Sequence, residues 1–162
     1  MSQHIDHHEL RSTLGRFTTG VTIVTTPVGD SVHAMTLNAF LSVSLDPPLI
    51  AVCINKNAKM HGLIAASGVY GVSVLPHEAA HVSQHFAGRP VDGFEPRFTW
   101  VGSVPLLEGA IAHLGTTVID AHEVGDHTIY TGEIRYFNHT DDKPLIFFGG
   151  RYRSLGMENV PA

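Results

Sequence analysis

A series of short runs of strand-forming residues, each bounded by turn residues, constrains this chain more than any other feature. Residues 21–26 read Val-Thr-Ile-Val-Thr-Thr, and a run with a branched side chain at every position favours a strand over a helix. Residues 27–31, Pro-Val-Gly-Asp-Ser, have the composition of a turn, so residues 32–37 are predicted to return as an antiparallel hairpin partner.

Later segments continue this pattern. Residues 41–45 alternate apolar residues with serine, and residues 49–54 are continuously apolar, as in a strand buried on both faces. Further strands are predicted at 69–75, 98–102, 111–122, 128–138 and 144–148. Because most connections between them have hairpin length, the predicted fold is α+β and mainly antiparallel, a barrel with a few peripheral helices.

Three helices are expected around these strands. Asp6 and Glu9 form a capping box before a helix over about 7–17, which would carry Leu10, Leu14 and Phe17 on one stripe. Residues 55–66 have helical spacing and end at Ser-Gly, and residues 77–86 form a shorter helix. A Gly-rich fingerprint between a strand and a helix is missing, which argues against a Rossmann unit.

Length, charge and cysteine content narrow the function. A chain of 162 residues suits one domain, residues 1–162, and its formal charge of −5 without a Lys/Arg cluster argues against nucleic-acid binding. Only 15% of the residues are charged, which is consistent with a surface partly covered in a homodimer. The chain has a single cysteine, Cys53, and a polar N-terminus, which indicate a cytoplasmic protein. Its apolar runs are far shorter than the roughly 20 residues of a membrane span, so we expect no membrane role.

The stretch over residues 33–49 carries an unusual set of neutral hydrogen-bonding side chains. Thr36, Asn38, Ser42 and Ser44 offer donors and acceptors, and the Asn38 amide can supply both to one edge of a heteroaromatic ring. The alternative is a plain strand-turn-strand whose hydroxyl groups face solvent.

Residues 36–48, Thr-Leu-Asn-Ala-Phe-Leu-Ser-Val-Ser-Leu-Asp-Pro-Pro, resemble the signature of the flavin reductase-like split-barrel family, Thr-x-Asn-Ser-Phe-x-Ser-Val-Ser-x-x-Pro-Pro. The resemblance implies a split β-barrel in which this segment wraps the isoalloxazine ring. Ala39 stands where the family has a small hydroxyl residue, so a side-chain contact there is in doubt. The cofactor-binding residues implied in this segment are Thr36, Leu37, Asn38, Ala39, Ser42, Val43 and Ser44.

The segment Cys53-Ile54-Asn55-Lys56-Asn57-Ala58-Lys59 resembles the part of the family that holds the flavin phosphate. A helix N-terminus and a lysine both favour an anion, so Lys59 is the predicted phosphate contact; a solvated helix lysine is the alternative. Cys53, Ile54 and Asn55 would lie near the ring. Phe86 could cover the flavin or the adenine, or simply anchor a loop.

Two later motifs resemble the nicotinamide side of the family. Gly125-Asp126-His127 matches a Gly-Asp-His motif, in which His127 would act as the catalytic residue that contacts the nicotinamide. Near the C-terminus, Arg151 and Tyr152 follow two glycines, where they would pair with a pyrophosphate and pack against a ring. The resemblance extends from about residue 10 to residue 155.

The family therefore implies an NAD(P)H-dependent flavin reductase, with NADH preferred. Such an enzyme would transfer hydride to free FMN or FAD, bind flavin at the interface of a homodimer, and supply reduced flavin to a separate monooxygenase. A non-catalytic flavin-binding or shuttle protein is the first alternative. A split-barrel oxidase acting on a small amine is another, although its richer basic phosphate site is not visible.

A remote alternative is a zinc metallohydrolase, because residues 77–81, His-Glu-Ala-Ala-His, satisfy the H-E-x-x-H pattern. Pro76 places this pattern in the first turn of a short helix, and a third ligand is not evident. We therefore expect no metal site.

Overall fold

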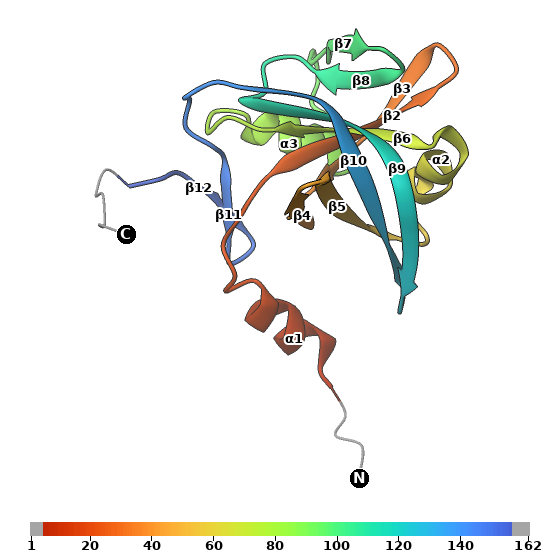
Figure 1. Cartoon of the computed structure of the whole chain (residues 1–162). Coiled ribbons are helices and arrows are strands. Elements are labelled where there is room, and N and C mark those ends of the chain that lie inside the picture. Colours follow the sequence, from red (N-terminus) through yellow and green to blue (C-terminus); the bar gives the residue numbers. More distant parts are fainter. Residues whose placement is uncertain (1–4, 157–162) are drawn as a thin grey trace.

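The computed structural model describes residues 5–156, which form a curled, mainly antiparallel sheet with three short helices (Figure 1). The main sheet has seven strands in the spatial order β3 (Ser31–Leu37), β2 (Thr22–Val28), β6 (Val69–Val74), β9 (Ala112–Val124), β10 (His127–His139), β5 (Pro48–Asn55) and β4 (Phe40–Leu45). The helices are α1 (His7–Leu14), α2 (Lys59–Ser67) and α3 (Ala80–Phe86). A three-stranded sheet holds β1 (Thr19–Gly20), β11 (Ile146–Phe148) and β12 (Arg151–Arg153), and β7 (Phe98–Val101) pairs with β8 (Val104–Leu107).

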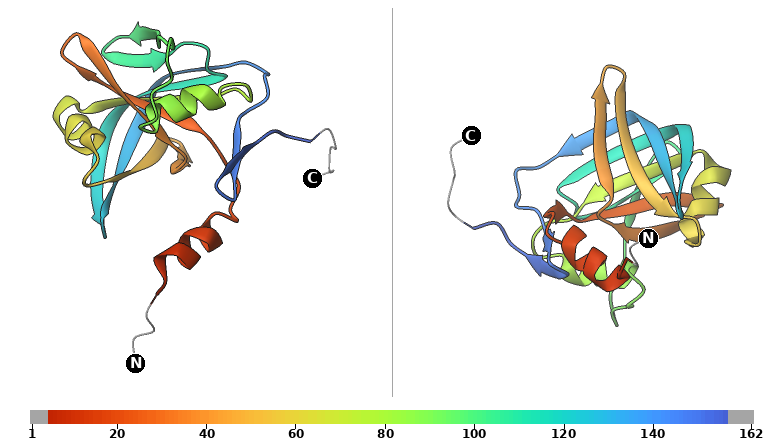
Figure 2. Two further views of the ribbon diagram at one scale, coloured as in Figure 1. Left: turned by 180° about the vertical axis from the view of Figure 1, so that it is seen from behind. Right: turned by 90° about the horizontal axis from the view of Figure 1, so that it is seen from below.

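The two edge strands of the main sheet, β3 and β4, follow one another in the chain. Only Asn38 and Ala39 separate them, and the Cys53 N–H on β5 donates to the Ala39 carbonyl at 3.1 Å. The sheet therefore curls until its two edges meet at this connection (Figure 2). Within residues 5–156, however, β3 and β4 do not pair with each other, so the sheet does not close into a complete barrel. The predicted antiparallel split-barrel architecture is confirmed.

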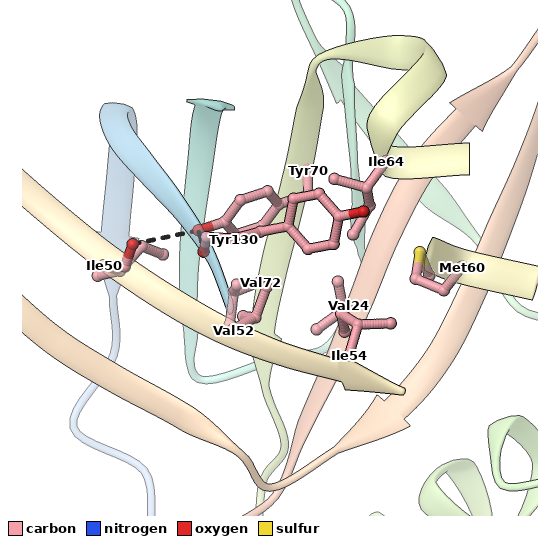
Figure 3. Packing of buried hydrophobic residues seen from close by; sticks show 9 residues of the cluster. All are labelled: Val24, Ile50, Val52, Ile54, Met60, Ile64, Tyr70, Val72 and Tyr130. Carbon is pink, nitrogen blue, oxygen red and sulfur yellow. Dashed lines mark hydrogen bonds between the residues drawn. The ribbon is translucent and has the colours of Figure 1, made fainter. Parts of the chain in front are cut away.

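The core consists of two clusters on opposite faces of β2. Val24 faces the cluster that Figure 3 shows, whose nine buried members are Val24, Ile50, Val52, Ile54, Met60, Ile64, Tyr70, Val72 and Tyr130. Ile23 faces the second cluster, which Val82 of α3 and Ala79, the residue before this helix, cover. Because β2 is covered on both faces, five consecutive residues of this strand are buried.

A hydroxyl group ties the first cluster together. The Tyr70 hydroxyl donates to the carbonyl groups of Ile50 and Tyr130, each at 3.3 Å. Burial raises the pKa of Tyr70, so it stays a protonated donor.

Helix boundaries differ from the sequence predictions. Asp6 caps α1 by accepting from the N–H groups of His8 and Glu9, but the helix ends at Leu14 rather than at residue 17. Leu14 and Phe17 are 64% and 80% exposed, so the predicted stripe is not packed against the sheet. Helix α2 begins at Lys59 instead of residue 55, because Asn55 still pairs with His127 at the end of β5.

Helix α3 begins at Ala80, three residues later than predicted. Pro76 forms a β-bridge with Pro144, and the His77 N–H donates to the Lys143 carbonyl at 2.9 Å. These long-range bonds hold the chain in a turn before the helix. Short strands β1, β8 and β12 were not predicted, and β8 contains Pro105, a residue that argues against a strand in a sequence.

None of the helices within residues 5–156 has the length and apolar character that crossing a bilayer requires.

Gly71 tests the close packing of β6. A Cβ atom at this position would lie 2.6 Å from the Pro105 carbonyl oxygen and from Thr25 Oγ1. Gly71→Ala should therefore lower the free energy of unfolding by about 1–3 kcal/mol in urea titration. The control Gly62→Ala, in α2 with no atom within 4 Å, should raise it by about 0.5–1 kcal/mol. Equal stability of the Gly71→Ala variant and the parent would contradict this packing.

Candidate functional site

The connection between the edge strands presents its polar groups unevenly. Asn38 and Ala39 are exposed, and Asn38 Nδ2 donates to Thr19 Oγ1 at 3.3 Å. The Thr36 hydroxyl is already engaged, since it donates to the Ser83 carbonyl of α3 at 2.6 Å. Thr36 therefore positions α3 beside this segment. The Asn38 side chain, in contrast, exposes its amide to solvent.

The remaining predicted residues of this segment lie on or beside the β4 edge. Ser42 and Val43 are exposed, Ser44 is half-buried, and Leu37 packs against the first core cluster. As edge strands, β3 and β4 leave backbone N–H and C=O groups unpaired by the sheet. These groups, more than the hydroxyl side chains, are free to bind a planar polar ring.

The C-terminal hairpin lies next to the same connection. A cavity of about 170 Å³ is lined by Thr36, Asn38, Ser83 and Tyr152, together with Val21, Ala87 and Phe147. The Tyr152 hydroxyl is 2.8 Å from Ser83 Oγ, and its ring lies 5.7 Å from that of Phe147. Arg151 is exposed on β12 and does not line this cavity.

A larger groove of about 920 Å³ opens on the other side of Asn38. Ala39 and Phe40 line it from the sheet, and Leu14 and Phe17 line it from α1 and the residues that follow. Asn38 and Phe147 border both this groove and the smaller cavity. The predicted ring-binding segment therefore borders both the groove and the smaller cavity.

A third cavity, of about 680 Å³, lies between α2 and α3 along β3. Its lining residues are His33, Ala34, Met35, Thr36, Ala58, Lys59, His85, Phe86, Ala87 and Gly88. Ala58, the N-cap of α2, gives the helix no side-chain cap, so the first N–H groups of the helix lack that partner. The structure thus brings Lys59 and Phe86 together, as a phosphate site beside a ring would require.

Strands β5 and β10 place alternate residues on opposite faces of the sheet. Ile54 and Thr128 are paired and buried, whereas Cys53, Asn55 and His127 are only half-buried on the other face. Ile54 therefore belongs to the core, and its side chain, with no exposed surface, cannot reach a cofactor. Asn55 and His127 lie directly opposite each other in the strand register.

The hairpin between β9 and β10 turns at Gly125, whose φ of 57° favours glycine. Next to it, His127 Nδ1 lies 2.7 Å from Asp126 Oδ1. This hydrogen bond and the adjacent imidazole hold the pKa of Asp126 below its usual value, so the carboxylate accepts and His127 Nδ1 donates. His127 therefore presents Nε2 away from Asp126.

Lys56 fixes this hairpin to the end of β5. The Lys56 N–H donates to the Asp126 carbonyl at 2.9 Å, and its ammonium group lies 2.8 Å from Glu123 Oε2. Cys53 lies on the same side, where burial and then the charge of Asp126 raise the pKa of its thiol. The thiol is therefore more fully protonated near neutral pH than an ordinary cysteine, which lowers its reactivity.

The structure accordingly gathers most of the predicted residues into two neighbouring groups, one around Asn38 and Lys59 and one around His127, which the Cys53–Ala39 backbone bond joins. The cavities of the first group are also lined by residues that the sequence did not single out, among them His33, Ser83, His85, Ala87 and Phe147. These residues line the cavities because α3 and the C-terminal hairpin pack beside β3. A local sequence pattern does not predict such packing.

The H-E-x-x-H pattern does not form a zinc site. His77 lies in the turn before α3, outside the helix that contains His81, and its Nε2 is 3.2 Å from Glu78 Oε1. Within residues 5–156, no three His, Cys, Asp or Glu side chains are grouped so that they could hold a metal ion. The metallohydrolase alternative requires both histidines on one helix, and the structure does not provide this arrangement.

Comparison with known proteins identifies the family of this chain. Residues 14–156 match the family model described as flavin reductase like domain. An NADH-dependent flavin reductase of Rhodococcus sp is 50% identical over 151 residues, covering 91% of this chain and 86% of the relative. A flavin-dependent monooxygenase reductase subunit, HsaB, of Mycobacterium tuberculosis is 34% identical, covering 99% of this chain and 88% of that protein.

Among solved structures, flavin reductase PheA2 in its native state superposes with a TM-score of 0.91 at 37% identity, covering 94% of this chain and all of that chain (100%). The chain belongs to the flavin reductase-like family. The family predicted from the sequence motifs is thereby confirmed.

Alkylation of the thiol tests how close Asp126 lies to Cys53. Asp126→Asn removes a negative charge that opposes ionisation of the thiol, so it should lower the pKa of Cys53 and raise its alkylation rate at about pH 8 two- to threefold. Rates of iodoacetamide modification, followed by mass spectrometry across pH, give both values. The control Asp30→Asn, in the β2–β3 turn, should leave them unchanged. An unaltered rate in the Asp126→Asn variant would contradict the proximity.

Proposed function

We propose that this protein is an NADH-dependent flavin reductase that transfers hydride from NADH to free FMN or FAD and releases the reduced flavin to a separate monooxygenase. The carrying observation is the Cys53–Ala39 backbone bond, which places the open edge-strand connection beside the hairpin of His127. The relatives support the same function, because one is an NADH-dependent flavin reductase and another is the reductase subunit of a flavin-dependent monooxygenase.

The described residues fit a flavin in two parts. The isoalloxazine would lie against Leu37, Asn38 and Ala39, where exposed backbone and the Asn38 amide meet the groove and the small cavity. The phosphate would lie at Lys59 and the uncapped start of α2, because both favour an anion. Phe86 lines this second part and would cover the chain that joins ring and phosphate.

His127 is the residue that we assign to the nicotinamide. Asp126 holds Nδ1 as a donor, so Nε2 is left as an acceptor that can receive a hydrogen bond from the carboxamide N–H₂. The bound coenzymes supply the chemistry, a hydride transfer between two rings, and the protein aligns them. A strong acid or base is not required, which agrees with the largely neutral side chains around Asn38.

A homodimer is the assembly that we propose. Helix α1 buries none of its residues and projects from the sheet (Figure 1), while Leu14 and Phe17 expose apolar surface to the groove at Asn38. A second copy covering this surface would enclose the ring-binding segment and remove exposed hydrophobic area from water.

Three further points are proposals of the same kind. Residues 1–162 form one domain, the protein acts in the cytoplasm, and Arg151 contributes to nicotinamide pyrophosphate binding from its exposed place on β12. Either FMN or FAD can serve, because the depression at Asn38 and the cavity at Lys59 are both open.

His127→Ala tests the nicotinamide assignment. Loss of the Nε2 hydrogen bond should raise the Michaelis constant for NADH about tenfold and leave that for flavin within about twofold. Steady-state NADH oxidation with FMN and with FAD measures both constants, and His139→Ala, an exposed histidine at the end of β10, is the control. Unchanged NADH kinetics in the His127→Ala variant would contradict the assignment of His127 to nicotinamide binding.

The dimer is tested on its apolar surface. Leu14→Glu and Phe17→Glu would place charges in a buried interface and should convert a dimer into monomers in size-exclusion chromatography with light scattering. Trp100→Glu, on the separate β7–β8 hairpin, should leave the dimer intact. A parent protein with the mass of one chain would contradict the proposal.

A further inference from the structure

The cavity between α2 and α3 contains an ionisable side chain that the phosphate assignment does not use. His33 lines this cavity together with Lys59 and His85, and the lining includes no Asp or Glu. A cavity with these groups and the uncapped start of α2 is suited to an anion.

Strand alternation shows which way His33 points. Met35 and Leu37 pack against the first core cluster, which includes Met60 and Ile64 of α2, whereas Ala34 packs against the second cluster under α3. His33 shares the face of Met35 and Leu37, because residues two apart in a strand lie on one side. The imidazole therefore lies on the α2 side of β3, as Lys59 does.

The protonation of His33 depends on this environment. Burial, and then the positive charge of Lys59, lower the pKa of His33. His85, the other histidine of the lining, accepts the Val91 N–H at Nδ1 at 3.1 Å, so its ring is already engaged within the chain. We therefore assign the response to a bound anion to His33.

We propose that His33 is a second cation of the flavin-phosphate subsite and takes up a proton when a phosphorylated flavin binds. This inference rests on the proposed function and adds a pH dependence to it. An anionic phosphate beside His33 would offset the repulsion from Lys59 and favour the imidazolium. Phosphorylated flavins should then bind more tightly at low pH, and the advantage should fall as the pH rises through the pKa of His33 in the complex.

FAD and riboflavin together form the sharpest probe. A phosphate monoester such as that of FMN has a second pKa near about 6 and would itself titrate, whereas the pyrophosphate diester of FAD keeps its charge. Riboflavin carries the same ring without a phosphate. The ratio of FAD affinity to riboflavin affinity therefore isolates the protein's contribution at the phosphate.

Affinities would be measured by fluorescence titration of the full chain at about pH 6 and about pH 8. In the parent protein the FAD-to-riboflavin affinity ratio should fall about fivefold between these pH values, which requires the pKa of His33 to be about one unit higher in the complex than in the free protein. His33→Gln should lower the ratio at about pH 6 and abolish its pH dependence. His139→Gln, outside the cavity lining, should behave like the parent.

Calorimetry of FAD binding in two buffers of different ionisation enthalpy supplies a second measurement. The parent should take up a fraction of a proton per FAD near neutral pH, and His33→Gln should take up none. A pH-independent ratio in the parent, or equal proton uptake in the variant, would overturn the inference. Failure of the proposed function would look different, since NADH would then reduce none of the flavins, riboflavin included.

Discussion

The backbone hydrogen bond from Cys53 to Ala39 is the constraint on which the candidate site depends. It attaches the connection between the two edge strands to an inner strand of the same sheet, so the sheet curls without closing. Both edges keep unpaired backbone groups at the place where Asn38 is exposed. Since β5 also pairs with β10, the same strand sets the distance between this connection and the hairpin of His127. The segment that we propose for the ring and the residue that we propose for the nicotinamide would thus be positioned by one strand and not by loops.

Helix packing explains how the second part of the site is formed. Strand β2 is covered on both faces, which leaves its neighbour β3 at the rim with α2 on one side and α3 on the other. The cavity at Lys59 lies between these helices because β3 has no further strand beside it. The Thr36 hydroxyl then secures α3 to the rim through the Ser83 carbonyl, so this side chain also supports one wall of the cavity.

Much of this arrangement was predictable, because strand alternation and turn residues act locally. The β2–β3 hairpin and the antiparallel class follow from patterns of a few residues. Three features did not follow. Helix α3 starts late because Pro76 and His77 bond to residues 143–144, far along the chain. The continuous apolar run of β5 concealed which of Cys53 and Ile54 faces the core, and the engagement of Thr36 by Ser83 depends on how α3 docks. Long-range contacts thus decided each of these outcomes, whereas the order of the motifs was enough to identify the family.

The charge distribution of the site suits an enzyme that must release what it reduces. Most groups that line the groove at Asn38 are neutral, Arg11 being the charged one, and neutral hydrogen bonds contribute only about 0.5–1.5 kcal/mol each after exchange with water. The chain carries a net charge of −5, yet the cavity lining at α2 contains only basic ionisable groups. Recognition of a phosphate in this cavity would therefore be local and electrostatic, in surroundings that repel anions at longer range. Such a combination would give selectivity for a phosphorylated flavin together with an affinity low enough for exchange, which a protein that delivers reduced flavin to another enzyme requires.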